Sequence, residues 1–384
     1  MKPTKTLTFT LLAALAFPCA ARADQKTKTL DVYWIDSEGG GSTLIVTPND
    51  ESFLIDTGNP GGRDSGRIIA AAKAAGLEKI DYMAITHWHI DHMGGAAEVA
   101  QQIPFGTIYQ RAYLAPNDPD GRQFQMAGGG FRDITSKRES LAAGVVIPLK
   151  PVAGGPKFEI RVLAADKKFV EATPEQMKTK NPLTDTGITK NLAPTDNDNS
   201  AVFLISFGDF RFFDGGDLTW DYEAQLVTPY NRAGVVDVYQ TDHHGLVMSN
   251  NPVLMKSLSP TVIVMNNGAR KGGEPGTFEG IKTVPNVAAF YQLHKSLNVP
   301  AEENTKAEFI ANNDSPPGGF GRGRGPGAPG APATPPPPPP PAPDPNVKLD
   351  DGNFIKMSVA PDGKSYTITV PSRNSSKTYQ TKVK

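Results

Sequence analysis

Four side chains able to bind a metal ion lie close together in the segment Thr86–Gly95. They are His87, His89, Asp91 and His92, and they directly follow a predicted strand. In extended backbone, side chains two residues apart point the same way, so His87 and His89 can bind one cation. Asp91 and His92 fall where the chain turns toward a helix and can bind a second cation. Two neighbouring cations can hold a hydroxide between them, and such a hydroxide is a nucleophile for hydrolysis.

Histidines are concentrated at such positions in this chain. Five of its six histidines form two clusters, each after a predicted strand: His87, His89 and His92, then His243 and His244. The sixth, His294, lies in a segment whose pattern predicts a helix, and we expect it to be an ordinary structural residue.

Strands alternating with helices are expected to position these clusters. Strand patterns cover Leu30–Ile35, Thr43–Val46, Phe53–Ile55, Ile80–Ile85, Phe158–Leu163, Ala201–Phe207, Phe210–Phe213, Val236–Gln240 and Thr261–Met265. Helical spacing favours helices from Asp64 or Ser65 to Ala75, from about Gly94 to Gln102, and around Val287–Leu297. Residues 112–143 look like an insertion over one face, and such segments often carry substrate contacts. The pattern predicts an α/β fold.

The pattern His87-x-His89-x-Asp91-His92 matches in full the signature of the metallo-β-lactamase superfamily, which the chain resembles from about Leu30 to Ile310. The resemblance implies an αββα sandwich with the metals at one edge. Phe53–Gly58 resembles the superfamily's early strand motif, in which the aspartate, here Asp56, supports a metal ligand. Phe213–Asp217 resembles its later Gly-Asp motif, which implies that Asp217 bridges both metals.

The chain is also similar to the β-lactamase-like domain of competence-type DNA-uptake proteins. Asn197–Ser200, Gly216-Asp217 and His243-His244-Gly245 carry this similarity. It implies that the His-His-Gly motif supplies the last ligand of the second metal, and we favour His243 over His244 for that role.

The chain departs from the family pattern in one respect. No histidine lies between His92 and His243, where many members supply a third ligand of the first site. The first site then relies on His87, His89, Asp217 and water, with Asn197 or Asp198 nearby. Asn266, Asn267 and Gly268 either supply pocket donors or form a loop after a strand.

The resemblance and the ligand set lead us to expect a metal-dependent hydrolase of a small-molecule ester, lactone or lactam. Asp91 would orient the nucleophile and relay a proton to the leaving group. Nitrogen and carboxylate ligands suit zinc, in two ions, with manganese or iron as alternatives. Phosphodiester cleavage and a metal-binding protein without turnover stay open.

Composition divides the chain into four expected segments. Residues 1–23 have a basic start, a short apolar run and Ala21-x-Ala23, typical of a cleaved signal peptide, so we expect export to the periplasm or the medium. Residues 24–314 form the metallo-β-lactamase-like domain. Residues 315–346 hold 14 prolines and predict a disordered linker or loop, and residues 347–384 predict a β-hairpin docking on the domain.

Charge and hydropathy limit the expected partners. Without residues 1–23, 36 basic residues face 40 acidic ones, so strong binding of nucleic acid is not expected. No segment is apolar over the roughly 20 residues that a membrane-spanning helix needs. The only cysteine, Cys19, lies in the predicted signal, so no thiolate ligand is expected.

Overall fold

The computed structural model describes residues 28–187, 189–312 and 354–383. The predicted signal segment 1–23 and the Pro/Gly-rich segment 315–346 lie outside the described residues.

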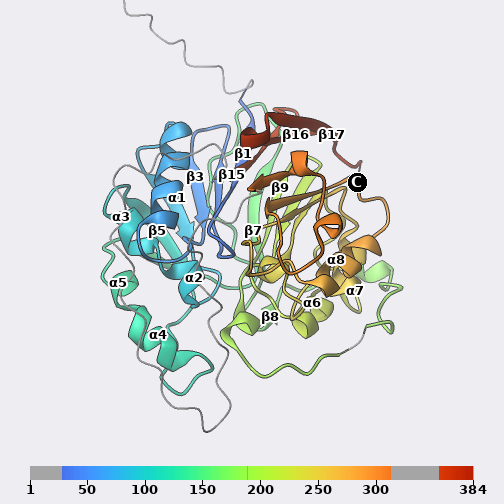
Figure 1. The fold of residues 1–384 in the computed structure, drawn as a ribbon, viewed down its shortest axis with the longest axis horizontal. Coiled ribbons are helices and arrows are strands. Elements are labelled where there is room, and N and C mark those ends of the chain that lie inside the picture. Colours follow the sequence, from blue (N-terminus) through green and yellow to red (C-terminus); the bar gives the residue numbers. More distant parts are fainter. Residues whose placement is uncertain (1–27, 188, 313–353, 384) are drawn as a thin grey trace, which may run out of the picture.

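Two large mixed sheets form the centre of the described part of the molecule (Figure 1). The first has nine strands, in the order β17 (Ser375–Gln380), β16 (Ser365–Val370), β15 (Phe354–Val359), β1 (Leu30–Ile35), β2 (Thr43–Val46), β3 (Ser52–Ile55), β4 (Ile80–Ala84), β5 (Phe105–Gln110) and β6 (Lys137–Ser140). The second has eight, in the order β14 (Ile310–Asn312), β13 (Ala289–His294), β12 (Val262–Met265), β11 (Val238–Gln240), β10 (Phe210–Asp214), β9 (Val202–Phe207), β7 (Phe158–Ala165) and β8 (Lys168–Phe169).

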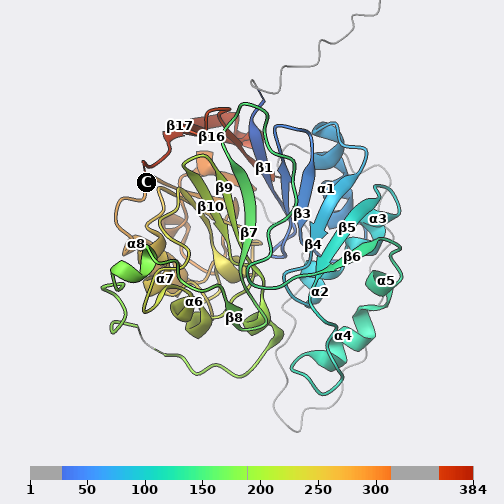
Figure 2. The same ribbon diagram turned by 180° about the vertical axis from the view of Figure 1, so that it is seen from behind.

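Helices cover the outer face of each sheet, as the two opposite views show (Figures 1 and 2). Beside the first sheet lie α1 (Arg63–Ala74), α2 (Ile90–Met93), α3 (Ala96–Ala100), α4 (Gly121–Ala127) and α5 (Gly129–Arg132). Beside the second lie α6 (Trp220–Val227), α7 (Pro252–Leu258) and α8 (Pro275–Lys282). The short 3₁₀ turns are η2 (Gln176–Lys178), η3 (Asp196–Asn199), η4 (Asp242–Gly245), η5 (Ala301–Glu303), η6 (Ala307–Phe309) and η8 (Pro371–Arg373). This arrangement confirms the predicted αββα fold.

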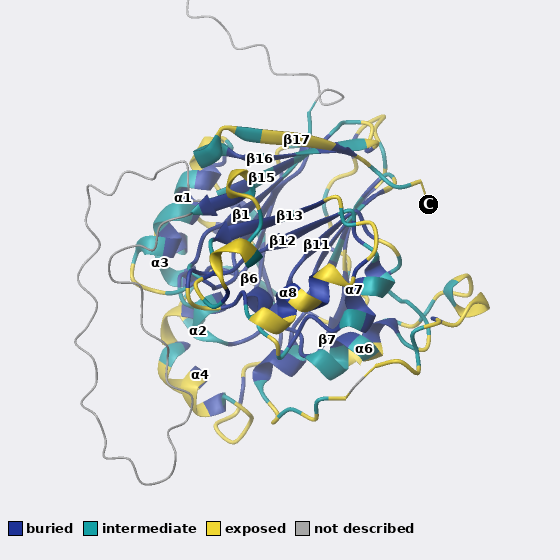
Figure 3. Cartoon of the chain, turned by 45° about the vertical axis from the view of Figure 1, so that its right-hand side comes forward, coloured by how far each residue is buried: buried dark blue, intermediate teal, exposed yellow. Residues whose placement is uncertain are grey.

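The main core lies between the sheets, where the strands are dark blue in Figure 3. Aromatic rings from both sheets meet there: Trp34 packs edge-on against Phe212 with ring centroids 5.4 Å apart, and Phe53 against Phe203 at 5.5 Å. Two further apolar clusters lie between the sheets and their helices, one for the first sheet and one for the second. Burial of these rings removes a large apolar area from water and holds the two sheets face to face.

One predicted helix is wrong. Residues 287–297 contain the strand β13 instead, paired in parallel with β12 and β14. Tyr291 and Leu293 from this strand are buried in the core between the sheets. A strand covered on both faces has no two-residue alternation, so its apolar residues resemble one face of a helix.

The chain after residue 353 returns to the beginning of the fold. β15 and β16 form an antiparallel hairpin, and a third strand that we did not anticipate, β17, pairs with β16. β15 pairs with β1, so these strands extend the first sheet.

Several parallel strands end at one edge of the sandwich. β3 and β4 are parallel in the first sheet, and β10, β11, β12 and β13 are parallel in the second. Because the carboxyl ends of parallel strands meet at the same edge, the loops after them converge. Among the described residues, no helix has both the length and the apolar character that crossing a membrane requires.

Candidate metal centre

Four potential metal ligands converge at this edge, and we call them the four-ligand cluster: Asp91, His92, Asp217 and His244. One ligand atom of each lies within 4.8 Å of the others. His92 Nε2 is 3.2 Å from Asp217 Oδ2, and His244 Nε2 is 3.4 Å from Asp91 Oδ2 and 3.5 Å from Asp217 Oδ2. We expected His243 in this role, but His244 is the member of the cluster.

Loops from both sheets supply the cluster. Asp91 and His92 lie in α2, after β4, and Asp217 follows β10. His243 and His244 lie in the turn after β11, with φ of 51° and 55°. Left-handed backbone is uncommon for residues other than glycine and is found mainly at sites that the surrounding structure fixes.

Asp56 orients His92. Its Oδ2 is 2.7 Å from His92 Nδ1, while its Oδ1 accepts a hydrogen bond from the Thr86 amide at 2.8 Å. A Cβ atom on Gly41 would lie 2.6 Å from His92 Nδ1, which is too close for any side chain. Glycine at this position therefore lets the loop between β1 and β2 pack against the Asp56–His92 pair. A carboxylate on one ring nitrogen leaves the other for a metal and fixes the ring's direction.

A second group of side chains approaches Asp217. His87 Nε2 is 3.7 Å from Asp217 Oδ2, and His243 Nε2 is 3.4 Å from the same oxygen. The Asn197 amide nitrogen is 3.3 Å from His243 Nε2.

His89 contacts a residue that sequence analysis did not identify. Its Nε2 is 2.9 Å from Oδ2 of Asp120, which lies just before α4. The same oxygen accepts hydrogen bonds from Thr195 Oγ1 and the Asp196 amide, both at 2.8 Å. The segment 112–143 thus contacts the site through the carboxylate of Asp120, which bonds His89.

Several buried polar atoms around Asp217 lack a hydrogen-bond partner in the described structure: His87 Nε2, Asp217 Oδ1 and Asn197 Oδ1. Buried polar atoms are nearly always paired, so a group of unpaired ones around a carboxylate calls for a ligand. Imidazole nitrogens and carboxylate oxygens are ligands of zinc and related divalent cations. The residues therefore fit a centre of two metal ions.

The histidines around Asp217 differ in protonation. Burial lowers the pKa of His87 well below its usual value and that of His243 to about 4, so both are neutral. Burial also opposes the charged form of His92, but Asp217, Asp56 and Asp91 raise the pKa of His92 well above its usual value. A neutral imidazole can bind a metal without first losing a proton.

The two carboxylates are ionised. Burial disfavours their charged forms, but Lys271 and His92 hold the pKa of Asp91 well below its usual range. His244 and His92 do the same for the pKa of Asp217. A cation would thus find two negative ligands near neutral pH.

Two expected residues are not brought to the cluster. Asp198 accepts a hydrogen bond from Thr219 Oγ1 at 2.7 Å. Asn267 donates to the carbonyls of Gly268 and His294. The neighbouring Asn266 instead lines the small hollow beside His92 and Asp217.

Trp88 belongs to the packing of the fold. It is 2% exposed and its ring packs against Phe124 and Phe131 with centroids 4.9 and 5.2 Å away. These contacts hold the segment 112–143 against the signature loop.

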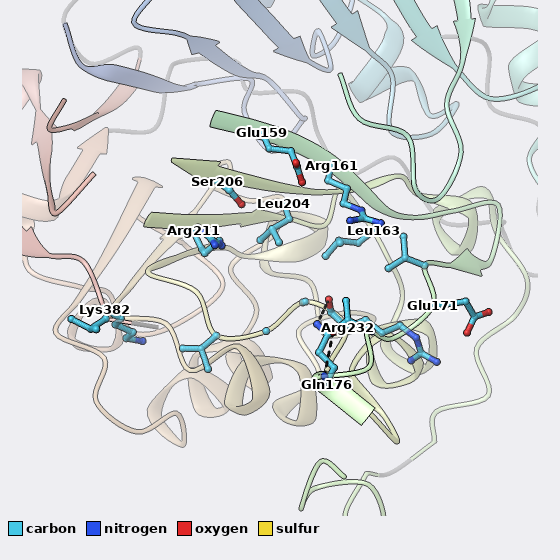
Figure 4. Close-up of a pocket in the computed structure, with 16 residues that line it drawn as sticks. Glu159, Arg161, Leu163, Glu171, Gln176, Leu204, Ser206, Arg211, Arg232 and Lys382 are labelled. Atoms are coloured by element: carbon cyan, nitrogen blue, oxygen red, sulfur yellow. Dashed lines mark hydrogen bonds between the residues drawn. The ribbon is translucent and has the colours of Figure 1, made fainter. Parts of the chain in front are cut away.

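A larger cavity of about 830 Å³ lies over β7, β9 and β10, away from the cluster (Figure 4). Its cationic lining residues are Arg161, Arg211, Arg232 and Lys382. Arg211 and Arg232 donate to backbone carbonyls, and no residue of the four-ligand cluster lines the cavity. This cavity is therefore not the metal centre.

Another histidine lies among carboxylates at the ends of β1 and β13. His294 Nε2 is 2.8 Å from Asp36 Oδ1 and 3.7 Å from Glu38 Oε1, and Arg67 pairs with Asp36 Oδ2 at 2.7 Å. Because Arg67 and His294 already neutralise Asp36, this group is an ion-pair network between the sheets.

Comparison with known proteins supports this description. Residues 36–172 match the model of the metallo-beta-lactamase superfamily. Over 99 residues the chain is 30% identical to an atrochrysone carboxyl ACP thioesterase of Cryptosporiopsis sp. (strain 8999), covering 25% of this chain and 30% of that protein. Over 230 residues it is 24% identical to the competence protein ComA of Neisseria gonorrhoeae, covering 60% of this chain and 26% of that protein.

The chain thus spans less than a third of the length of either relative. Among solved structures, it is similar to CmlA, a diiron β-hydroxylase from Streptomyces venezuelae. The identity is 16% and the TM-score 0.34, with 62% of this chain and 44% of that one covered. The family match over residues 36–172, together with the αββα fold, confirms the resemblance of this chain to the metallo-β-lactamase superfamily.

Proposed function

We propose that this protein is a metal-dependent hydrolase whose nucleophile is a water molecule activated at the cluster. The observation that carries the proposal is the convergence of Asp91, His92, Asp217 and His244 within 4.8 Å. The unpartnered atoms His87 Nε2 and Asp217 Oδ1 support a second metal position beside it.

The roles of the residues follow from their contacts. When bound, divalent cations lower the pKa of a coordinated water from 15.7 to about 7. With metal bound, Asp217 would bridge the two positions, and Asp56 fixes the tautomer and direction of His92. Asp91 is 13% exposed, so it can reach both the cluster and a substrate, orient the water and pass a proton to the leaving group.

The substrate that we favour is a small acyl compound: an ester, thioester, lactone or lactam. The thioesterase relative, at 30% identity over 99 residues, supports acyl cleavage. Zinc is the proposed metal, with manganese or iron as alternatives, because the ligands are imidazoles and carboxylates. Export, which rests on residues 1–23 alone, is proposed with it.

Phosphodiester cleavage is the second candidate. The match to the competence protein covers 60% of this chain, against 25% for the thioesterase, and supports it. The same ligands can polarise a phosphoryl oxygen as well as a carbonyl oxygen.

A hydrolysis screen tests the proposal. Protein loaded with zinc is assayed on nitrocefin, lactones, aryl esters and thioesters, and a bis-aryl phosphate, each with and without chelator. We expect one of these classes to be cleaved, the chelator to abolish cleavage, and Asp217→Asn to lower kcat at least about a hundredfold.

Asp198→Asn is the matched control, because Asp198 is also buried but bonds Thr219 outside the cluster. Cleavage that survives both the chelator and Asp217→Asn would overturn the proposal. Metal-loaded protein inert toward every class would indicate a metal-binding protein without turnover.

A further inference from the structure

We propose that the consecutive histidines His243 and His244 bind different metal ions. His244 completes the second site with Asp91 and His92, and His243 completes the first site, where many members of the family carry a histidine that this chain lacks. This inference rests on the proposed function and concerns how its metal centre is built.

Four imidazoles approach the same oxygen of Asp217. His92 Nε2 and His244 Nε2 lie 3.2 and 3.5 Å from Asp217 Oδ2. His243 Nε2 and His87 Nε2 lie 3.4 and 3.7 Å from that oxygen. Four imidazole nitrogens thus surround one carboxylate, and only two of them belong to the four-ligand cluster.

Hydrogen bonds direct Nε2 of His87 and Nε2 of His243 toward Asp217. Ser249 Oγ lies 3.4 Å from His243 Nδ1, and Thr86 Oγ1 lies 3.0 Å from His87 Nδ1. When a histidine's Nδ1 has a hydrogen-bond partner, its Nε2 is left for a metal. His87 Nε2 has no hydrogen-bond partner in the described part of the chain.

The backbone explains how neighbours in sequence can face one carboxylate. His243 and His244 are both left-handed, and Gly245 follows with φ of 81°. The His243 amide donates to the Gly216 carbonyl at 2.9 Å, which ties this turn to the loop carrying Asp217. Two consecutive left-handed residues other than glycine persist only where their surroundings hold them.

Asp198 and Asn197 are less suited than His243 to be the last ligand of the first site. Asp198 is bonded to Thr219, away from the cluster. Asn197 does approach His243, and its unpartnered Oδ1 can add an oxygen ligand next to the imidazole. An amide oxygen is a weaker zinc ligand than an imidazole, so Asn197 supplements His243 and does not replace it.

Cysteine substitution gives a direct readout that does not depend on turnover. In the full chain with Cys19→Ser, no cysteine remains, and His243→Cys, His244→Cys and Val247→Cys each add one thiol. Metal-free protein is titrated with Co²⁺, and the near-ultraviolet charge-transfer band of a thiolate bound to Co²⁺ is recorded. Val247 is the control, because it is 37% exposed and lies just beyond the same turn.

We expect the band in His243→Cys and His244→Cys and not in Val247→Cys. A second substitution assigns each band to a site. His92→Ala should abolish the band of His244→Cys and leave that of His243→Cys, whereas His87→Ala should do the reverse.

The inference is overturned if His243→Cys gives no band, or if both bands respond to the same second substitution. If the cysteine variants do not fold, as judged by circular dichroism, zinc stoichiometry of His243→Gln replaces them. That variant should lose about one of two equivalents, and retention of both would contradict the inference. A parent protein that takes up no Co²⁺ or Zn²⁺ would instead refute the proposed function.

Discussion

Among single side chains, Lys271 influences the charge of the metal centre through Asp91. Its ammonium contacts Asp91 Oδ2, and it helps to hold the pKa of Asp91 well below its usual range. A cation bound by Asp91 must share that carboxylate with the lysine. Lys271 is 44% exposed, so water and salt screen its charge.

We predict that Lys271→Met strengthens zinc binding at the second site about one and a half to fivefold. Exposed charge pairs contribute about 0.2–1 kcal/mol, which sets this range. Competition titration with a chromophoric chelator measures the change. Lys282→Met is the control, since Lys282 forms a similar exposed pair with Glu303. Unchanged or weaker binding in Lys271→Met would contradict the prediction.

The signature residues could be identified from sequence because they are neighbours in the chain. Asp56 and Asp217 followed from motifs that the family resemblance supplied. Asp120 could not be found in this way, because it is one polar residue in a loop and only the folded chain brings it to the site. The choice between His243 and His244 depended on left-handed backbone that no pattern of residue types reveals.

At the scale of elements, the segment between β5 and β6 completes the surroundings of His89. Asp120 has φ of 60° and lies just before α4, and Trp88 packs against Phe124 in that helix. The hydrogen bond from His89 holds the pKa of Asp120 well below its usual range. Burial opposes protonation of His89, but Asp120 raises its pKa.

We predict that Asp120→Asn weakens metal binding at the first site about 10–100-fold, the usual effect of removing the carboxylate behind a histidine ligand. The step of a zinc titration that His87→Ala removes reports it, and the other step should not move. Asp118→Asn is the control, because Asp118 is exposed and, among the described hydrogen bonds, its carboxylate accepts one only from the Ala115 amide. Equal loss in both variants would show that the loop as a whole, and not this carboxylate, matters.

Element boundaries were largely predictable where amphipathic periodicity or turn residues mark them, as in α1 and in the strands β1, β2, β3 and β4. β13 was not, because parallel strands buried on both faces lack alternation.

For the whole molecule, the Asp36–His294 pair joins the two sheets. Asp36 follows β1 of the first sheet, and His294 ends β13 of the second. Burial opposes the charged form of His294, but Asp36 raises the pKa of His294 above its usual value. Both side chains are almost inaccessible to water, so their interaction is little screened.

This pair predicts a pH dependence of stability. A histidine whose pKa is raised on folding stabilises the protein fully below its unfolded pKa of about 6.5, and loses that contribution as pH rises through the folded value. The Tm of metal-free protein should therefore fall as pH rises above about 6.5. In His294→Gln, the part of this fall in Tm that comes from His294 should be absent. Melting curves across this range, with chelator throughout, measure it, and parallel curves for both proteins would refute the prediction.

The pairing of β1 with β15 constrains the order in which the chain can fold. Leu30 lies opposite Val359, so the first sheet joins residues from distant parts of the sequence. During synthesis, the free edge of β1 stays unpaired until residue 359 has left the ribosome. Closing so long a loop is slow, and an open strand edge invites association with other chains. Nascent chains of this protein should therefore need chaperone protection until β15 is available.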